Sequence, residues 1–329
     1  MRLGPRGWAL GARPRRGARD SGLGARGSGL GIRAVTLTTV ILALLHVAQG
    51  ARGPQSPGLV PRRIVSLVPS ATEVLFAIGA GPRVAAVSSF DHYPPQVESL
   101  PRVGALVDPD VERILSLRPD LVVVYASQID LRAQLERARI PVYVYRHGSL
   151  ADITAGMRAM GNRLGLPAEA EAAAASIERG LAEVAAGVAG RPRPRTMLVI
   201  GREPQSLRAI NVSGGLGFLH DLLELAGGRN AFGDVKRESM IVATETILAR
   251  GPEVILELNY AGRTSRGEEE RERAVWNLLP GVPAVRSGRI HLLYGGEFVV
   301  PGPRVVMTAR AFARAIHSLI SAGPRRPIP

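Results

Sequence analysis

An internal repeat constrains the fold of this chain more than any other feature of its sequence. Residues 111–124 (VERILSLRPDLVVV) and residues 244–257 (TETILARGPEVILE) share one order: a short helical pattern, a proline, an acid and a strand-like run. Residues 73–79 and 221–227 form a second matched pair, and each of these segments ends in glycine. Two matches in the same order predict two α/β lobes of similar topology.

Short β-branched runs alternate with helical patterns on both sides of these repeats. We expect strands at 64–67, 84–87, 121–124, 142–145, 196–200 and 290–293, and helices near 111–117 and 131–138. Ser70-Ala71-Thr72-Glu73 fits a capping box, with Ser70 as N-cap and Glu73 at the third helical position. This helix is predicted to end near Ile78, before a glycine-rich turn.

The segment between the lobes has a different composition. Residues 150–164 and 168–189 are rich in Ala, Glu, Arg and Leu, and the second piece predicts one helix of about twenty residues, ~30 Å long. The predicted fold is therefore α/β: two similar lobes joined by one long backbone helix, with a ligand cleft between them. The expected organisation is a signal peptide at 1–50, a linker at 51–63, an N-terminal lobe at 64–149, a helical connector at 150–194, a C-terminal lobe at 195–322 and a tail at 323–329.

The first fifty residues have the pattern of an export signal. An arginine-rich stretch precedes the mostly apolar segment Ala34–Ala48, which at fifteen residues is shorter than a membrane span of ~20. Ala48 and Gly50 occupy A-x-A-like positions, so we expect cleavage after Gly50 and a periplasmic protein. An uncleaved membrane anchor, and with it a membrane-anchored scaffold, is the alternative.

Composition and motifs exclude several classes of function. The net charge of +14 comes mainly from arginines before residue 64 and in the tail, so a basic face for nucleic acid is not expected. The chain has no cysteine, which excludes disulfides and thiolate sites. It lacks a P-loop and a Gly-x-Ser-x-Gly elbow, and its six histidines lack metal-ligand spacing. We therefore predict no metal site and no enzymatic activity; a secreted α/β enzyme would need an acid–base pair that the sequence does not show.

Polar and aromatic residues follow the predicted strands, where open α/β sheets hold ligands. Residues 89–95 place Asp91, His92 and Tyr93 after one strand, and Arg202 follows another. Residues 295–303 hold the equivalent place in the second lobe. The candidate ligand-binding residues of that loop are Gly296, Glu297, Phe298, Val299 and Val300.

Three segments carry a family resemblance: RIVSLVPSATE at 63–73, DHYPP at 91–95 and the run from Glu112 to Val122. They resemble the periplasmic binding proteins for vitamin B12, within the long-helix binding proteins of siderophore, haem and cobalamin importers. The likeness covers about 64–320. It implies that Tyr93 contacts the ligand, that Gly296–Val300 is a contact segment of the second lobe, and that Glu112 and Glu245 dock onto arginines of the importer's membrane subunits.

The resemblance implies a receptor that delivers a cobalamin-like corrinoid to an ABC importer, as a monomer without a cofactor of its own. Haem or a ferric siderophore is the alternative ligand. Haem would use Tyr93 or His92 as axial ligand, whereas free pocket arginines, for which Arg202 and Arg304 are candidates, would favour a siderophore. The chain departs from the B12 pattern in lacking cysteines and in having few aromatic residues, with Trp276 the only tryptophan after the leader.

Overall fold

A computed structural model describes residues 60–260 and 265–318. The predicted signal peptide, most of the linker and the tail lie outside these residues. Among the described helices, none has the length and apolar character needed to cross a membrane.

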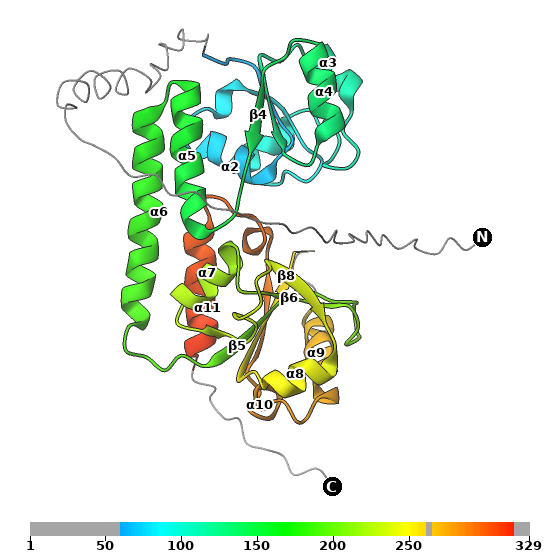
Figure 1. The fold of residues 1–329 in the computed structure, drawn as a ribbon, viewed down its shortest axis with the longest axis vertical. Coiled ribbons are helices and arrows are strands. Elements are labelled where there is room, and N and C mark those ends of the chain that lie inside the picture. The colour runs from blue at the N-terminus through cyan, green and yellow to red at the C-terminus, as the bar shows by residue number, and fades with distance from the viewer. Residues whose placement is uncertain (1–59, 261–264, 319–329) are drawn as a thin grey trace, which may run out of the picture. The chain divides into compact units, whose positions relative to one another are not determined.

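The N-lobe, as we call residues 64–149, is built around a four-stranded parallel sheet (Figure 1). The strand order is β2-β1-β3-β4, and all neighbouring pairs are parallel. The predicted strands at 84–87 and 142–145 match the structure to the residue. The elements in chain order are β1 (Ile64–Ser66), α2 (Pro69–Ala77), η1 (Gly81–Arg83), β2 (Val84–Val87), η2 (Pro95–Ser99), α3 (Val111–Ser116), β3 (Leu121–Tyr125), α4 (Ile129–Arg137) and β4 (Val142–Tyr145).

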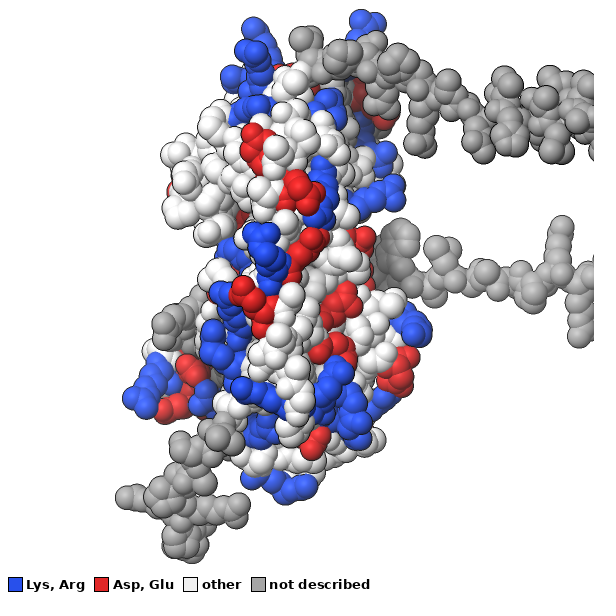
Figure 2. Space-filling view, turned by 90° about the vertical axis from the view of Figure 1, so that its left-hand side faces the viewer, with Lys and Arg blue, Asp and Glu red and all other residues white. Residues whose placement is uncertain are grey.

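Two consecutive helices follow the N-lobe. α5 (Leu150–Leu164) ends at Gly165, whose φ of +70° is readily adopted by glycine, and α6 (Pro167–Val188) extends for 22 residues. They pack side by side (Figure 1). The long helix predicted from the sequence is α6, and α5 is its partner. On the face that carries α6, acidic and basic side chains are interspersed (Figure 2), and Arg158 there lies 2.7 Å from Glu171 and 2.6 Å from Glu178.

The C-lobe, as we call described residues from 195 onward, repeats this plan with an addition. Its sheet has the order β10-β9-β5-β6-β8, with β7 also paired to β5. Strands β5, β7, β9 and β10 are parallel like those of the N-lobe, whereas β6 and β8 are antiparallel and have no counterpart there. The elements are β5 (Arg195–Gly201), β6 (Ile210–Ser213), α7 (Phe218–Leu225), β7 (Arg229–Asn230), β8 (Ser239–Val242), α8 (Thr244–Arg250), β9 (Val254–Asn259), α9 (Arg266–Ala274), η3 (Val275–Leu278), α10 (Pro283–Arg286), β10 (Ile290–Tyr294), η4 (Gly296–Phe298) and α11 (Val305–His317).

The sequence repeat is visible in the hydrogen bonds at the start of the strands. Asp120, just before β3, accepts from the backbone N–H of Arg63 at 2.8 Å. Glu253, just before β9, accepts from the backbone N–H of Arg195 at 2.7 Å. Each of these arginines also donates from its guanidinium to the carbonyl oxygen that ends the helix before the acid. The two lobes therefore use the same anchor for their central strands.

One hydrophobic cluster runs through both lobes and the connector. Gly180 of α6 allows α11 to pack closely, since a Cβ at this position would lie only 2.8 Å from Cγ1 of Val306. The cluster therefore joins the lobes by shared packing as well as by the chain itself. Its fully or nearly buried members include Ile64, Leu75, Met157, Leu164, Leu181, Leu256 and Phe312.

The predicted capping box of α2 is wrong. The N-cap is Val68, no side chain caps the helix, and Pro69 occupies the first turn. Proline suits this place because its missing N–H would have no intrahelical partner there. Ser70 and Glu73 are buried instead, and the Glu73 carboxylate pairs with Arg304 of the C-lobe.

Candidate functional site

The two lobes meet through residues that lie beyond the carboxyl ends of their parallel strands. Arg304, the N-cap residue of α11, donates from Nε to Oε2 of Glu73 at 3.0 Å and from Nη2 to Oε1 at 2.5 Å. Tyr145, at the end of β4, donates its hydroxyl proton to the carbonyl oxygen of Pro301 at 3.4 Å. Burial raises the pKa of Tyr145 to about 12, so its hydroxyl stays protonated. Loops of both lobes therefore come together at this boundary.

Tyr93 lies at this boundary, as the sequence predicted, in the loop that follows β2. Its side chain is 43% exposed, and its ring centroid lies 4.2 Å from Cζ of Arg304. His92, next to it, is exposed, with Nδ1 3.5 Å from Oε1 of Glu98. Tyr93 thus offers an aromatic face and a hydroxyl where the lobes meet.

Asp91 is in contrast part of the lobe interior. It is 1% exposed, and its carboxylate accepts from the backbone N–H of Ser88 at 2.9 Å and from the Ser88 hydroxyl. Burial raises the pKa of Asp91, and the Ser88 hydrogen bonds oppose this. The prediction that Asp91 contacts the ligand is therefore wrong: it holds the loop that carries Tyr93.

The predicted contact segment of the C-lobe, residues 296–300, also contains both accessible and buried residues. Gly296 is exposed, and Val299 and Val300 are half-buried. Glu297 faces Arg304, with Oε2 3.4 Å from Nη1. Phe298 is only 6% exposed and stacks on Phe312 with ring centroids 6.3 Å apart, so it belongs to the core rather than to a ligand surface.

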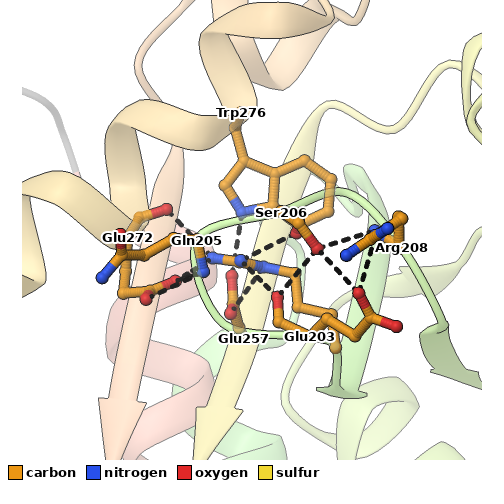
Figure 3. Close-up of polar contacts among 8 residues, drawn as sticks. Glu203, Gln205, Ser206, Arg208, Glu257, Glu272 and Trp276 are labelled. Atoms are coloured by element: carbon orange, nitrogen blue, oxygen red, sulfur yellow. Dashed lines mark hydrogen bonds and ion pairs between the residues drawn. The ribbon is translucent and has the colours of Figure 1, made fainter.

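Arg202, just past the end of β5, lies in a polar network with Glu257 and Glu272. Figure 3 shows these two glutamates together with Trp276. Its Nε is 3.0 Å from Oε1 of Glu257, and its Nη2 donates to Oε2 of Glu272 at 2.8 Å. Trp276 donates from Nε1 to the other oxygen of Glu257 at 2.8 Å. Burial raises the pKa of Glu257, and Arg202 opposes this. Because its side chain is 2% exposed, Arg202 is not available to a ligand, which corrects the sequence prediction.

The strand ends also carry exposed apolar side chains that sequence reasoning did not single out. Phe90 after β2 is 66% exposed, Ile129 after β3 is 69% exposed and Tyr260 after β9 is 68% exposed. Glu73 was also missed. Two signals were available in the sequence. One was the acid Glu73 in the mostly apolar helix after β1. The other was an apolar residue a few positions after a strand: Phe90 and Tyr260 in loops, and Ile129 at the start of α4.

The two predicted docking acids occupy equivalent places in the two lobes. Glu112 is in the first turn of α3 and Glu245 in the first turn of α8, and both side chains are exposed. Among the described residues, no group of three or more His, Asp or Glu side chains could hold a metal ion.

Residues 64–294 match the family described as periplasmic binding protein. The chain belongs to this family. A vitamin B12-binding protein of Salmonella paratyphi A is 28% identical over 259 residues, which cover 78% of this chain and 91% of that protein. A vitamin B12-binding protein of Pectobacterium atrosepticum is 29% identical over 267 residues, covering 79% and 90%.

Solved periplasmic binding proteins share its two-lobed architecture. The periplasmic vitamin B12 binding protein of Vibrio cholerae has a TM-score of 0.66 at 24% identity, over 78% of this chain and 97% of the other. The periplasmic haem-binding protein of Roseiflexus sp. RS-1 has a TM-score of 0.63 at 27% identity, over 78% and 99%. Binding proteins for different ligands thus share this fold, so the ligand has to be argued from the site.

Proposed function

We propose that this chain is a periplasmic receptor that binds a cobalamin-like corrinoid between its lobes and delivers it to an ABC importer. The observation that carries the choice of ligand is the state of the two candidate arginines. Arg304 faces Glu73 and Glu297, and Arg202 faces Glu257 and Glu272. Each guanidinium therefore already has two carboxylate partners.

The ligands differ in charge. Haem carries two propionates and ferric catecholates are strongly anionic, so both need cations that are free to pair with them. A corrinoid presents mainly neutral amides around an apolar ring. Both arginines are already paired with carboxylates and neither is free to pair with an anionic ligand, which favours the corrinoid.

Exposed side chains that follow the strands support the same choice. Phe90, Tyr93 and Tyr260 offer apolar area beyond the ends of strands in both lobes. A large flat ligand needs such area together with a few polar groups for orientation. The relatives named vitamin B12-binding proteins support this ligand, and the solved haem-binding proteins make haem, bound through Tyr93 or His92, the competing outcome.

Titration of the purified protein separates these ligands. Cyanocobalamin, haem and a ferric catecholate are added in turn, and binding is followed by calorimetry and absorption. We expect cyanocobalamin to bind at least ~100-fold more tightly than the two anionic ligands, a difference of about 3 kcal/mol. Tighter binding of haem, with a spectrum of tyrosinate or histidine ligation, would reject the corrinoid.

Delivery to the importer is proposed to use Glu112 and Glu245. Each exposed carboxylate begins a helix in its lobe, and two equivalent acids suit a membrane dimer that presents one surface twice. An arginine on each membrane subunit would form a bidentate, charge-assisted contact with one acid. We propose that the receptor acts as a periplasmic monomer and has no enzymatic activity.

The docking proposal is tested in vesicles that contain the importer. Replacing both Glu112 and Glu245 by Ala should leave ligand affinity unchanged and reduce uptake at least tenfold, since a desolvated charge pair contributes about 2–5 kcal/mol. Glu169→Ala is the matched control, because Glu169 is also an exposed acid in the first turn of a helix, α6. Uptake equal to wild type in the double variant would reject docking through these acids.

A further inference from the structure

One ion pair at the lobe boundary joins side chains that are 231 residues apart, Glu73 on α2 and Arg304 at the start of α11. We propose that Arg304 is a positioning residue for ligand binding. Its guanidinium, held by Glu73, packs against the Tyr93 ring and fixes that ring at the ligand site. The inference rests on the proposed site around Tyr93.

The guanidinium of Arg304 is held on its edges. Nε and Nη2 donate to the two oxygens of Glu73 at 3.0 and 2.5 Å, and Nη1 lies 3.4 Å from Oε2 of Glu297. The Arg304 side chain is 15% exposed and that of Glu73 is 3% exposed. A planar guanidinium bound on its edges in this way has one orientation, and what it leaves open is its face.

Tyr93 covers that face. Its ring centroid lies 4.2 Å from Cζ of Arg304, a close cation–π distance. Because Tyr93 is on an N-lobe loop and Arg304 begins a C-lobe helix, this contact ties the loop to the opposite lobe. Inside the N-lobe the loop is held by Asp91, which accepts from Ser88, and by Arg102, which donates to the carbonyl oxygens of Ser88 and Asp91.

The surroundings keep Arg304 in place. Gly302 lies against the Glu73 carboxylate, so close that a Cβ there would be 3.1 Å from Oε2. Thr308 of α11 donates its hydroxyl proton to the carbonyl oxygen of Glu297 at 3.0 Å. Each of the three nitrogens of Arg304 already donates to a carboxylate and its side chain is 15% exposed, so we infer that it acts on the ligand through Tyr93 rather than by pairing with the ligand itself.

The contact is tested first without ligand, by hydrogen exchange of peptides covering residues 88–95. Arg304→Gln should raise exchange in this loop about tenfold, because the ring loses its cationic support. Arg310→Gln is the matched control: it removes another α11 arginine, which pairs with Glu183 at 3.1 Å on the surface. Equal exchange in Arg304→Gln and wild type would overturn the proposal whatever the ligand is.

A buried glutamate left without its arginine can unfold the protein, so a second variant is included. Glu73→Gln combined with Arg304→Gln removes both charges and leaves no unpaired carboxylate at the buried position 73; Glu297, the other partner of Arg304, is 25% exposed and stays in contact with water. It should show the same faster loop exchange as Arg304→Gln. Wild-type exchange in this folded double variant would also overturn the proposal.

The effect on binding is measured with cyanocobalamin as a double-mutant cycle. Arg304→Gln should weaken binding about tenfold when Tyr93 is present and less than about twofold in the Tyr93→Ala background. A tenfold loss in both backgrounds would show that Arg304 acts without Tyr93 and would overturn the positioning role. If wild type does not bind cyanocobalamin, the proposed ligand is wrong, and the cycle is run with haem, where the same difference is expected and its absence overturns the inference.

Discussion

The N-lobe and the C-lobe are built alike where their strands begin and differently where their strands end. At the starts, Asp120 accepts from the backbone N–H of Arg63, just before β1, and Glu253 accepts from the backbone N–H of Arg195, the first residue of β5. At the ends, the N-lobe presents the exposed Tyr93, whereas the C-lobe encloses Arg202 among carboxylates. The lobes are thus alike at the ends of the strands that anchor the sheets and differ at the ends that carry the candidate site residues.

One pair of equivalent positions shows what changed. In the repeat, Val124 of β3 corresponds to Glu257 of β9. Val124 is fully buried in an apolar cluster, while Glu257 is 8% exposed and binds Arg202 and Trp276. Apolar packing stabilises this part of the N-lobe. A charged network stabilises the corresponding part of the C-lobe, and there the loss of one partner leaves the other partners buried without their hydrogen bonds or ion pairs.

The largest effect is expected from Arg202→Ala. Removing the guanidinium leaves Glu257 buried without its cation, and such a loss typically destabilises a protein by about 3–5 kcal/mol. Urea unfolding measures it. Arg208→Ala is the control, since Arg208 pairs with Glu203 at 2.7 Å but is 79% exposed, and it should cost less than about 1 kcal/mol. Equal losses of unfolding free energy in both variants would show that the buried network of Arg202 stabilises the C-lobe no more than an exposed ion pair does.

Tyr93→Ala should act on binding and not on folding. Loss of the ring and hydroxyl is expected to weaken ligand binding by about 1–3 kcal/mol, ten- to a hundredfold, with the unfolding midpoint unchanged. Calorimetric titration and a melting curve measure the two quantities. A lowered midpoint with unchanged affinity would assign Tyr93 to the N-lobe fold alone.

Asp120→Ala should lower the free energy of unfolding more than Glu253→Ala does. Asp120 accepts from the backbone N–H groups of Arg62 and Arg63, whereas Glu253 accepts from that of Arg195. Urea unfolding should show a loss of about 1–2 kcal/mol for Glu253→Ala and about 1 kcal/mol more for Asp120→Ala. Equal losses would show that the second backbone hydrogen bond of Asp120 adds no stability.

The sequence predicted the parts of the fold that depend on local patterns. The long connector helix predicted at 168–189 agrees with α6, and the strands predicted at 84–87 and 142–145 agree with β2 and β4, because helix-forming composition and β-branching decide them. The antiparallel pair β6 and β8 was not predicted. Each of these strands has four residues, and they lie too far apart in the sequence for a hairpin signal.

The candidate site was predicted less well, because contacts between distant residues decide it. Tyr93 lies at the lobe boundary as expected. Arg202 was wrong because its partner Glu272 is 70 residues away, so nothing near Arg202 in the sequence indicated its burial. Glu73 has a local pattern that suits a capping box, and only the fold brings Arg304 to it.

The smallest effect is expected from two C-lobe histidines. Burial lowers the pKa of His291 and His317 below the usual 6.5. As the pH falls, these histidines are therefore protonated at a higher pH in the unfolded chain than in the folded protein. Their contribution to the free energy of unfolding is fully present above pH 6.5 and declines below pH 6.5. Melting temperatures at pH 7.5 and 5.5 measure this decline. A variant with both histidines replaced by Gln should lose less over the same interval; an equal loss would assign the decline to other groups.

The hydrophobic cluster that passes from the N-lobe through α5 and α6 to α11 has a consequence for folding. Neither lobe can complete its interior alone, because Phe312 of α11 packs in the same cluster as Ile64 of β1. Segments far apart in the sequence thus close one cooperative unit. The two lobes should therefore melt in a single heat-absorption peak, and a fragment of either lobe by itself should stay unfolded or aggregate.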